Sequence, residues 1–172
     1  ISIKSRDTAA SVMQDVVRAS TDADKIEALH DILNKPEYTK VLIFREMKRH
    51  VDKLADELKA RGFNALALHG DMHNRERERA VKSLESGRVQ VVIATDVAAR
   101  GLDISDISLV INYDIPNNYE TYVHRIGRTG RGTKTGTALT FVNGSVPRRD
   151  KPAFARSSAR PASRSTFRFK GR

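Results

Sequence analysis

The feature that most constrains the fold is a regular alternation between short apolar runs rich in β-branched residues and longer amphipathic stretches. The apolar runs predict strands over residues 12–17, 41–44, 65–68, 89–94, 109–112 and 137–142. Amphipathic stretches at residues 24–33, 47–59 and 75–84, and another that enters at Tyr119, have helical spacing. Strands that alternate with helices imply right-handed crossovers, so the sequence predicts an α/β fold with a mostly parallel sheet and helices on both faces.

Polar segments follow several of these strands. Ligands of open parallel sheets bind at the carboxyl ends of the strands. Unusual polar sequence occurs at four such ends, over residues 45–49, 69–74, 95–103 and 113–118. We therefore expect these four segments to meet at one edge of the sheet and to form the binding site.

Positive charge is concentrated near the end of the chain. Of a net charge of +10, residues 147–172 contribute nine lysines and arginines against Asp150 alone. This segment is rich in Ser, Arg and Pro and has no apolar periodicity, so burial cannot offset the entropy of ordering it. We expect a folded domain over residues 1–144 and a flexible basic tail over residues 145–172, and such a polycation is typical of phosphate binding.

Composition excludes several other classes of protein. The chain has no cysteine, which excludes disulfides and thiolate metal sites. No apolar run approaches the roughly 20 residues that span a bilayer. His30, His50 and His69 lack the spacing of paired metal ligands, so we expect no metal site in this chain. We expect a cytoplasmic protein without membrane contact.

The densest functional signal is the segment over residues 122–132. Arg125, Arg128 and Arg131 are three residues apart, and this spacing predicts that a helix projects them to one side while Tyr122 and Ile126 face the core. Planar guanidiniums suit phosphate oxygens, and two of them can stabilise a transferred γ-phosphoryl group. The alternative is a set of surface arginines paired with local carboxylates.

A second signal is Ala94-Thr-Asp-Val-Ala-Ala-Arg-Gly-Leu-Asp103, which follows a buried strand. Thr95 offers a hydroxyl and a backbone amide to a phosphate. Gly101 permits close approach of a ligand, and Asp103 can accept hydrogen bonds from ribose hydroxyls. The alternative is that Asp96 and Asp103 cap short helices.

The third signal is the segment over residues 69–77. Gly70 turns the chain out of a strand, and a helix that starts at His73 or Asn74 carries Arg75, Arg77 and Arg79. The alternative is a capped helix on which Glu76 and Glu78 pair with the arginines. The chain has no Gly-x-x-x-x-Gly-Lys-Ser/Thr loop and no Asp-Glu-Ala-Asp run, so the arginines need a nucleotide that another domain holds.

These motifs resemble the C-terminal RecA-like domain of DEAD-box RNA helicases over about residues 12–143. His124-Arg-Ile-Gly-Arg-Thr-Gly-Arg131 is similar to motif VI of that family, and residues 94–103 are similar to motif V. Phe44 with residues 45–48 resembles motif IV. His124, where related helicase families usually have Gln, favours the DEAD-box branch, whereas Asn74 departs from the usual Gln. The resemblance implies a RecA-like three-layer domain.

The resemblance also implies roles for individual residues. Arg128 and Arg131 reach the γ-phosphate of ATP, which binds with Mg²⁺ mainly to a first RecA-like domain absent from this chain. Gly101 and Asp103 lie near the ribose, and His124 and Arg125 help to couple the two domains. The residues implied to contact RNA are Thr95, Arg77, Gly70, Arg45 and Lys48.

The resulting hypothesis is the second motor domain of a monomeric ATP-dependent RNA helicase, inactive without the first domain. Its partners are RNA and the N-terminal RecA-like domain of the same protein. Two alternatives stay open. One is a DNA translocase of the same superfamily, because phosphate contacts do not distinguish sugars. The other is an RNA-binding or annealing module that does not use ATP.

Overall fold

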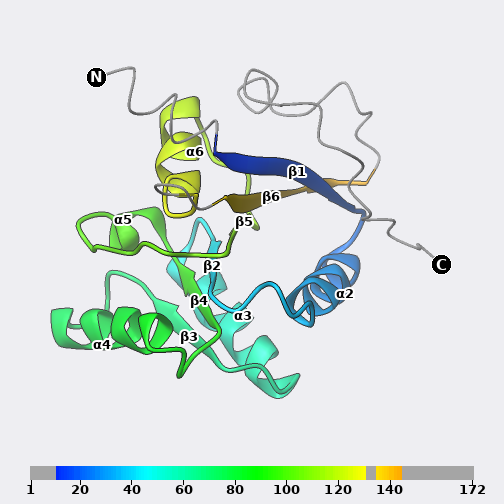
Figure 1. Cartoon of the computed structure of the whole chain (residues 1–172). Coiled ribbons are helices and arrows are strands. Elements are labelled where there is room, and N and C mark those ends of the chain that lie inside the picture. Colours follow the sequence, from blue (N-terminus) through cyan, green and yellow to red (C-terminus); the bar gives the residue numbers. More distant parts are fainter. Residues whose placement is uncertain (1–10, 131–134, 145–172) are drawn as a thin grey trace.

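The computed structural model describes residues 11–130 and 135–144, which form a single sheet and its covering helices (Figure 1). In chain order the elements are β1 Val12–Ala19, α2 Asp22–Leu33, β2 Val41–Phe44, α3 Lys48–Ala60, β3 Ala65–Leu68, α4 Asn74–Glu85, β4 Val91–Ala94, α5 Asp96–Ala99, β5 Leu109–Asn112, α6 Tyr119–Ile126 and β6 Gly136–Asn143. Every strand and every helix expected from the periodicity is present. The short helix α5 is an addition, and the expected tail lies outside the described residues.

The sheet has six strands in the order β1-β6-β5-β2-β4-β3, and every pairing is parallel. The first and last strands of the described chain pair over their full length, from Val12 beside Gly136 to Ala19 beside Asn143. The central strands β2, β4 and β5 are fully buried. Burial on both faces explains why their sequences are continuous apolar runs.

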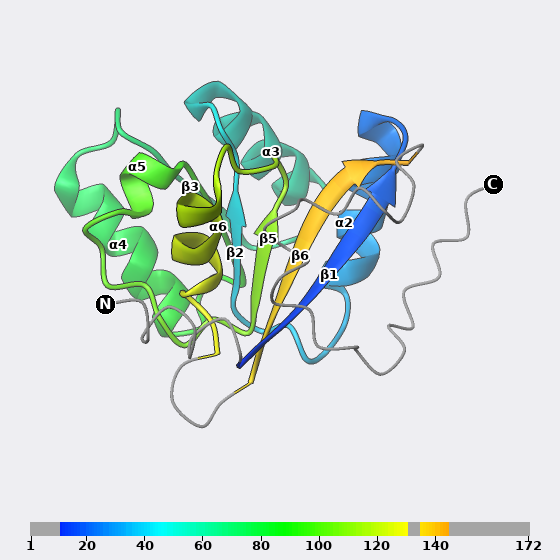
Figure 2. The ribbon, with the colours of Figure 1, turned by 90° about the horizontal axis from the view of Figure 1, so that it is seen from above.

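Helices cover both faces of the sheet (Figure 2). Alternate residues of one strand divide between the two cores: Val41 and Ile43 pack with α2 and α3, whereas Leu42 and Phe44 pack with α4, α5 and α6. This division confirms the expected three-layer α/β architecture. It also places α5 and α6, which carry the motif residues, on the same face.

Side-chain caps fix where the two motif helices begin. The Thr95 Oγ1 accepts the Ala98 backbone N–H at 3.4 Å at the start of α5. The Asn118 Oδ1 accepts the Thr121 N–H at 2.8 Å at the start of α6. Such caps satisfy backbone donors that have no partner inside the helix. Of the helices in the described part of the chain, none is long and apolar enough to span a bilayer.

Candidate functional site

The expected site segments do meet at the carboxyl edge of the sheet. The strand order β5-β2-β4-β3 places the residues that follow these strands in a row: Asp114, Arg45, Thr95 and Gly70. These positions are far apart in sequence and adjacent only because of the crossovers. The prediction that four polar segments share one edge is confirmed.

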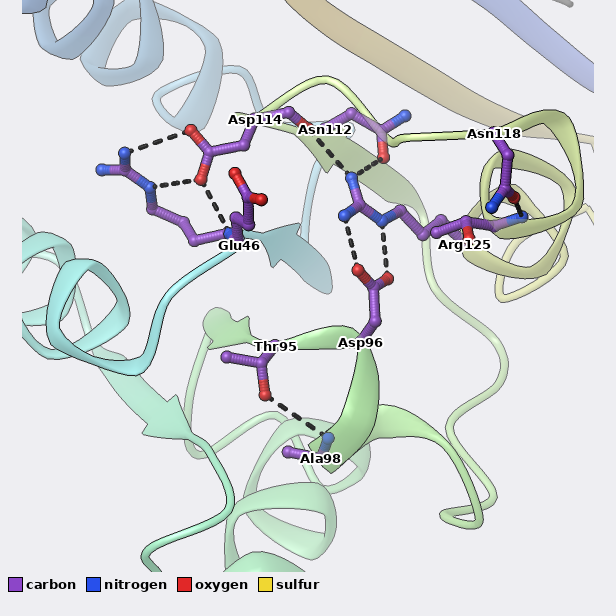
Figure 3. Close-up of polar contacts among 10 residues, drawn as sticks. Glu46, Thr95, Asp96, Ala98, Asn112, Asp114, Asn118 and Arg125 are labelled. Atoms are coloured by element: carbon purple, nitrogen blue, oxygen red, sulfur yellow. Dashed lines mark hydrogen bonds and ion pairs between the residues drawn. The ribbon is translucent and has the colours of Figure 1, made fainter.

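Arg125 is the centre of a buried polar network at this edge (Figure 3). Its Nε and Nη2 donate to the two carboxylate oxygens of Asp96 at 2.7 and 2.6 Å. Its Nη1 donates to the Asn112 side-chain oxygen at 3.1 Å and to the Asp114 carbonyl at 2.9 Å. The guanidinium carbon lies 5.1 Å from the centroid of the Phe44 ring, and the residue is only 3 % exposed. Arg125 therefore joins the ends of β4 and β5 to α6.

The expectation that three arginines share one helical face was wrong. Helix α6 ends at Ile126, so Arg128 lies beyond the helix, and Arg125 points into the domain. The physical reason is that Asp96, brought close by the sheet, supplies a carboxylate that satisfies Arg125 internally. The alternative of surface arginines paired with local carboxylates does not hold for Arg125 either, because Arg125 is buried and Asp96 lies 29 residues away in the sequence. Arg131 lies outside the described residues, whereas Tyr122 and Ile126 are buried as expected.

Arg128 binds to the loop that carries the two expected nucleotide contacts. Its Nη1 donates to the Leu102 carbonyl at 2.8 Å, and its Nη2 donates to the Ala99 carbonyl at 3.2 Å. Leu102 lies between Gly101 and Asp103. The three residues expected to contact ATP within the described chain, Gly101, Asp103 and Arg128, therefore lie close together. Gly101 has a φ of +82°, a conformation that favours glycine, and both Gly101 and Asp103 are exposed.

The turn that contains Arg128 is anchored on both sides. The Thr129 hydroxyl donates to the Ile107 carbonyl, and the Ser11 hydroxyl donates to the Gly130 carbonyl. Gly136 is required by packing, because a Cβ there would lie 2.1 Å from the Thr129 Oγ1. Anchoring of this kind fixes the guanidinium before a ligand arrives, as electrostatic stabilisation requires.

Arg45 forms a second ion pair at the same edge, with Asp114. Its Nε and Nη2 donate to the Asp114 carboxylate at 3.1 and 3.2 Å, and the Glu46 backbone N–H donates to the same carboxylate at 2.8 Å. Burial alone would raise the pKa of Asp114, but these hydrogen bonds and the Arg45 charge hold it below its usual value. Arg45 also lies 4.7 Å from the centroid of the Tyr113 ring. Its expected contact with RNA stays a prediction.

Thr95, and not Asp96, caps the short helix after β4. The alternative role of Asp96 as a cap is wrong, because its carboxylate binds Arg125. Asp103 caps no helix within the described chain. The Thr95 hydroxyl, which accepts from Ala98, can still donate its own proton to an anion. The expected phosphate contact of Thr95 is therefore chemically compatible with the structure.

The loop between β3 and α4 brings a further expected pair together. Lys48, the first residue of α3, forms an ion pair with Asp71 at 2.7 Å, so it lies beside Gly70. Helix α4 starts at Asn74, as expected, and the Arg77 Nη2 donates to the Asn74 side-chain oxygen. The Glu76 side chain accepts the His73 backbone N–H, and no arginine of the described residues forms an ion pair with it. Arg77 and its shorter Asn74 partner therefore interact locally.

A pocket opens between α5 and α6. It is lined by Phe44, Asp96, Ala99, Arg100, Thr121, His124, Arg125 and Arg128. The exposed side chains of Arg100 and His124 face this pocket, which makes Arg100 a candidate that the sequence reasoning missed. Asp96, Asn112 and Asp114 were missed as partners of arginine. The sequence does contain one indication of these three residues. Each is a polar residue that lies at the end of an apolar strand or within two residues after it.

The donor set of the site suits phosphate oxygens and not a metal ion. No group of three or more His, Cys, Asp or Glu residues within 11–130 and 135–144 is arranged to hold a metal. The carboxylates of Asp96 and Asp114 are instead occupied by Arg125 and Arg45. The chemistry that this edge offers is therefore a set of guanidiniums, hydroxyls and backbone amides.

Comparison with known proteins identifies the architecture. The family described as the helicase conserved C-terminal domain matches residues 24–133. The ATP-dependent RNA helicase DBP2 of Eremothecium gossypii is 44 % identical over 145 residues, which cover 82 % of this chain and 26 % of that protein.

Two solved structures are also similar. The Escherichia coli DEAD-box protein SrmB, bound to the regulator of ribonuclease activity A, superposes with a TM-score of 0.74 at 42 % identity, covering 77 % of this chain and 78 % of that one. Dbp5 of Saccharomyces cerevisiae, bound to RNA and ADP BeF3, has a TM-score of 0.72 at 35 % identity and covers 79 % and 37 %.

The match with curated relatives is confined to part of their length. The chain spans about a quarter of them, 26 % in DBP2 and 29 % in the CshA helicase of Bacillus subtilis. The parallel sheet with helices on both faces agrees with the domain match, which includes the residues of the Arg128 turn and of the 94–103 segment. The chain belongs to the helicase conserved C-terminal domain family and forms the C-terminal RecA-like domain of a DEAD-box RNA helicase.

Proposed function

We propose that this chain is the second motor domain of an RNA-stimulated ATPase that unwinds short duplexes by closing with a first RecA-like domain around ATP and RNA. The observation that carries the proposal is the fixed position of Arg128 against Ala99 and Leu102, beside Gly101 and Asp103. A guanidinium held in this way can stabilise the negative charge of a γ-phosphate that is bound to another domain. The relatives' names as ATP-dependent RNA helicases support the same reading.

In this proposal catalysis is mainly electrostatic positioning. ATP supplies the γ-phosphoryl group, and Mg²⁺ is held mainly by the first domain. Closure brings Arg128 and Arg131 to the phosphate, while Gly101 and Asp103 lie near the ribose. His124 faces the pocket between α5 and α6 and would meet the first domain. Arg125 would contribute to coupling indirectly, by holding Asp96 and therefore α5.

RNA is proposed to bind the carboxyl edge through Thr95, Gly70, Lys48 and Arg77, with Arg45 in support. The Dbp5 structure, which contains a similar domain, is bound to RNA and ADP BeF3. We propose that the whole protein is monomeric and cytoplasmic. The mass of the protein in solution and its location in the cell measure these two properties.

The isolated chain is expected to have negligible ATPase activity, with or without RNA. The reason is that it lacks the phosphate loop and the Asp-Glu-Ala-Asp run that hold phosphates and magnesium. Phosphate release by the pure chain, and by the protein that also carries the first domain, measures this directly. RNA-stimulated turnover by the isolated chain would overturn the proposal.

The same experiment separates the two alternatives. A DNA translocase would be stimulated by DNA as well as by RNA, because contacts with phosphates do not read the 2′-hydroxyl. An annealing module would show no ATPase activity even when the first domain is present. Stimulation by RNA alone in the two-domain protein supports the helicase.

Removal of residues 145–172 is expected to weaken RNA binding for all sequences and to flatten the dependence of log affinity on log salt. Residues 147–172 carry nine basic side chains, which displace condensed counterions from the RNA backbone. Titration of labelled RNA at several salt concentrations measures both quantities. Equal affinity and equal slope with and without the tail would show that it does not bind RNA.

A further inference from the structure

One of the residues proposed to contact RNA is already bound by an acidic side chain of the same domain. The Lys48 Nζ lies 2.7 Å from a carboxylate oxygen of Asp71, and the two side chains are 60 % and 62 % exposed. The hydrogen bond from Lys48 and its positive charge lower the pKa of Asp71. Lys48 therefore meets an internal anion at the place where an external phosphate is proposed to bind.

The position of Asp71 is fixed by contacts behind it. Its backbone N–H donates to the His69 Nδ1 at 3.3 Å. Because Nδ1 accepts, the proton is on Nε2, which lies 2.9 and 3.1 Å from the carboxylate oxygens of Asp52. His69 is 9 % exposed, and Asp52 lies one helical turn after Lys48 on α3. Helix α3 therefore holds the segment that contains Asp71 at two points.

The surface beside this pair is open to a ligand. A Cβ added at Gly70 would meet nothing within 4 Å, so the backbone there can be approached closely. A carboxylate and a phosphate both present oxygen acceptors that suit an ammonium group. A phosphate that reached Gly70 and Lys48 together would have to replace the Asp71 carboxylate.

The neighbouring ion pair, Arg45 with Asp114, is much less exposed than Lys48 with Asp71. Its side chains are only 17 % and 21 % exposed, and Asp114 also accepts the Glu46 backbone N–H. Such a pair costs much to separate, because either charge would remain buried without its partner. Exposed pairs such as Lys48 with Asp71 are weak and exchangeable. Lys48 is therefore the cation that can change partner.

We propose that Asp71 competes with RNA phosphate for Lys48 and so lowers the affinity of this edge for RNA. The inference rests on the proposed function, because it assumes that RNA binds at the carboxyl edge. In this view Asp71 stands in for a phosphate in the absence of RNA. Binding then exchanges one anion for another, which keeps the contact weak and readily released.

Asp71→Asn in the full chain is expected to raise affinity for a single-stranded oligoribonucleotide about two- to fivefold, the range that exposed ion pairs span. The slope of log affinity against log salt should steepen by up to about 0.7, the value for one added contact to a single strand. Fluorescence anisotropy at several salt concentrations measures both. A urea midpoint equal to that of the unchanged chain shows that the variant is folded, and the basic tail is common to every variant.

Two controls separate the pair from general electrostatics. Glu46→Gln removes the same charge near the same edge, and no cation pairs with the Glu46 carboxylate in the described chain, so a much smaller gain is expected. In the Lys48→Ala background, Asp71→Asn should add no more than Glu46→Gln does. An equal gain from Asp71→Asn with and without Lys48 would overturn the inference, since the effects would then be independent.

The outcomes also distinguish this inference from the proposed function. If Lys48→Ala weakens RNA binding and Asp71→Asn does not strengthen it, the competition is wrong while the RNA surface stands. If Lys48→Ala changes nothing, no phosphate binds Lys48, and both the competition and the proposed RNA contact at this position fail.

Discussion

Arg128→Ala in the protein that carries both motor domains is expected to slow ATP turnover by about 10³-fold or more, with a much smaller effect on ATP binding. The Arg128 guanidinium is held by the carbonyls of Leu102 and Ala99, so it can meet charge that develops on the γ-phosphoryl group without reorganising. Single-turnover hydrolysis and nucleotide titration measure the two effects separately. The same result is expected for Arg131→Ala from the sequence alone.

Two controls are needed for this prediction. Arg128 also satisfies backbone carbonyls, so its loss destabilises the Gly101 loop, and urea unfolding must show that the variant is folded under assay conditions. Arg88, exposed between α4 and β4 at the opposite edge of the sheet, is the matched control, and Arg88→Ala should leave turnover unchanged. A normal rate constant in Arg128→Ala would make this arginine purely structural.

Arg125→Ala is expected to lower the free energy of unfolding by about 3 kcal/mol, the low end of the cost of breaking a buried ion pair from one side, because the Asp96 side chain is 28 % exposed. Arg125 is 3 % exposed and donates to Asp96, Asn112 and the Asp114 carbonyl. Its removal leaves these acceptors without their donor and creates a cavity beside Phe44. The urea midpoint of the full chain, at an unchanged slope, measures the loss.

The matched control is an arginine pair of the same length on the surface. Arg61 lies 2.6 Å from Glu27, the same separation as Arg125 from Asp96, but Glu27 is 60 % exposed. Arg61→Ala should therefore shift the midpoint far less than Arg125→Ala. Equal shifts in the two variants would contradict a stabilising role for the buried network.

A second comparison tests whether charge burial is the cause. Arg125→Met fills much of the volume without charge, and the combination with Asp96→Leu removes the orphaned carboxylate as well. The double variant should be more stable than Arg125→Met alone, because replacing both partners leaves no half-buried carboxylate without its cation. If it is less stable, packing around Phe44 dominates.

Burial of Arg125 bears on its expected role in coupling the two domains, which stays a prediction. The residue fixes Asp96, and Asp96 begins α5 directly after Thr95, which is proposed to contact RNA. Arg125 lies two residues before Gly127, where the Arg128 turn begins. The nucleotide side and the RNA side of the proposed site are therefore joined by one buried side chain.

The strands and helices could be predicted from the sequence, because the local pattern of apolar residues determines each of them. Strands β2, β3 and β5 have the predicted bounds. In β2 and β5 every residue is buried, and a run buried on both faces must be apolar throughout. Gly62, with a φ of +91°, follows the end of α3, where a glycine in the left-handed conformation commonly ends a helix. Motif residues could also be assigned to the carboxyl edge, because parallel strands all end there.

Only the tertiary structure decided which charged groups pair. Spacing indicated a helix that would display Arg125 with Arg128, yet the sheet order brings Asp96 to Arg125 from 29 residues away. The same order brings Asp71 to Lys48 and Asp114 to Arg45. Apolar periodicity records which face of an element is buried, whereas an ion pair depends on the distance between two elements. That distance is set by the pairing of strands remote in sequence, and no local pattern contains it.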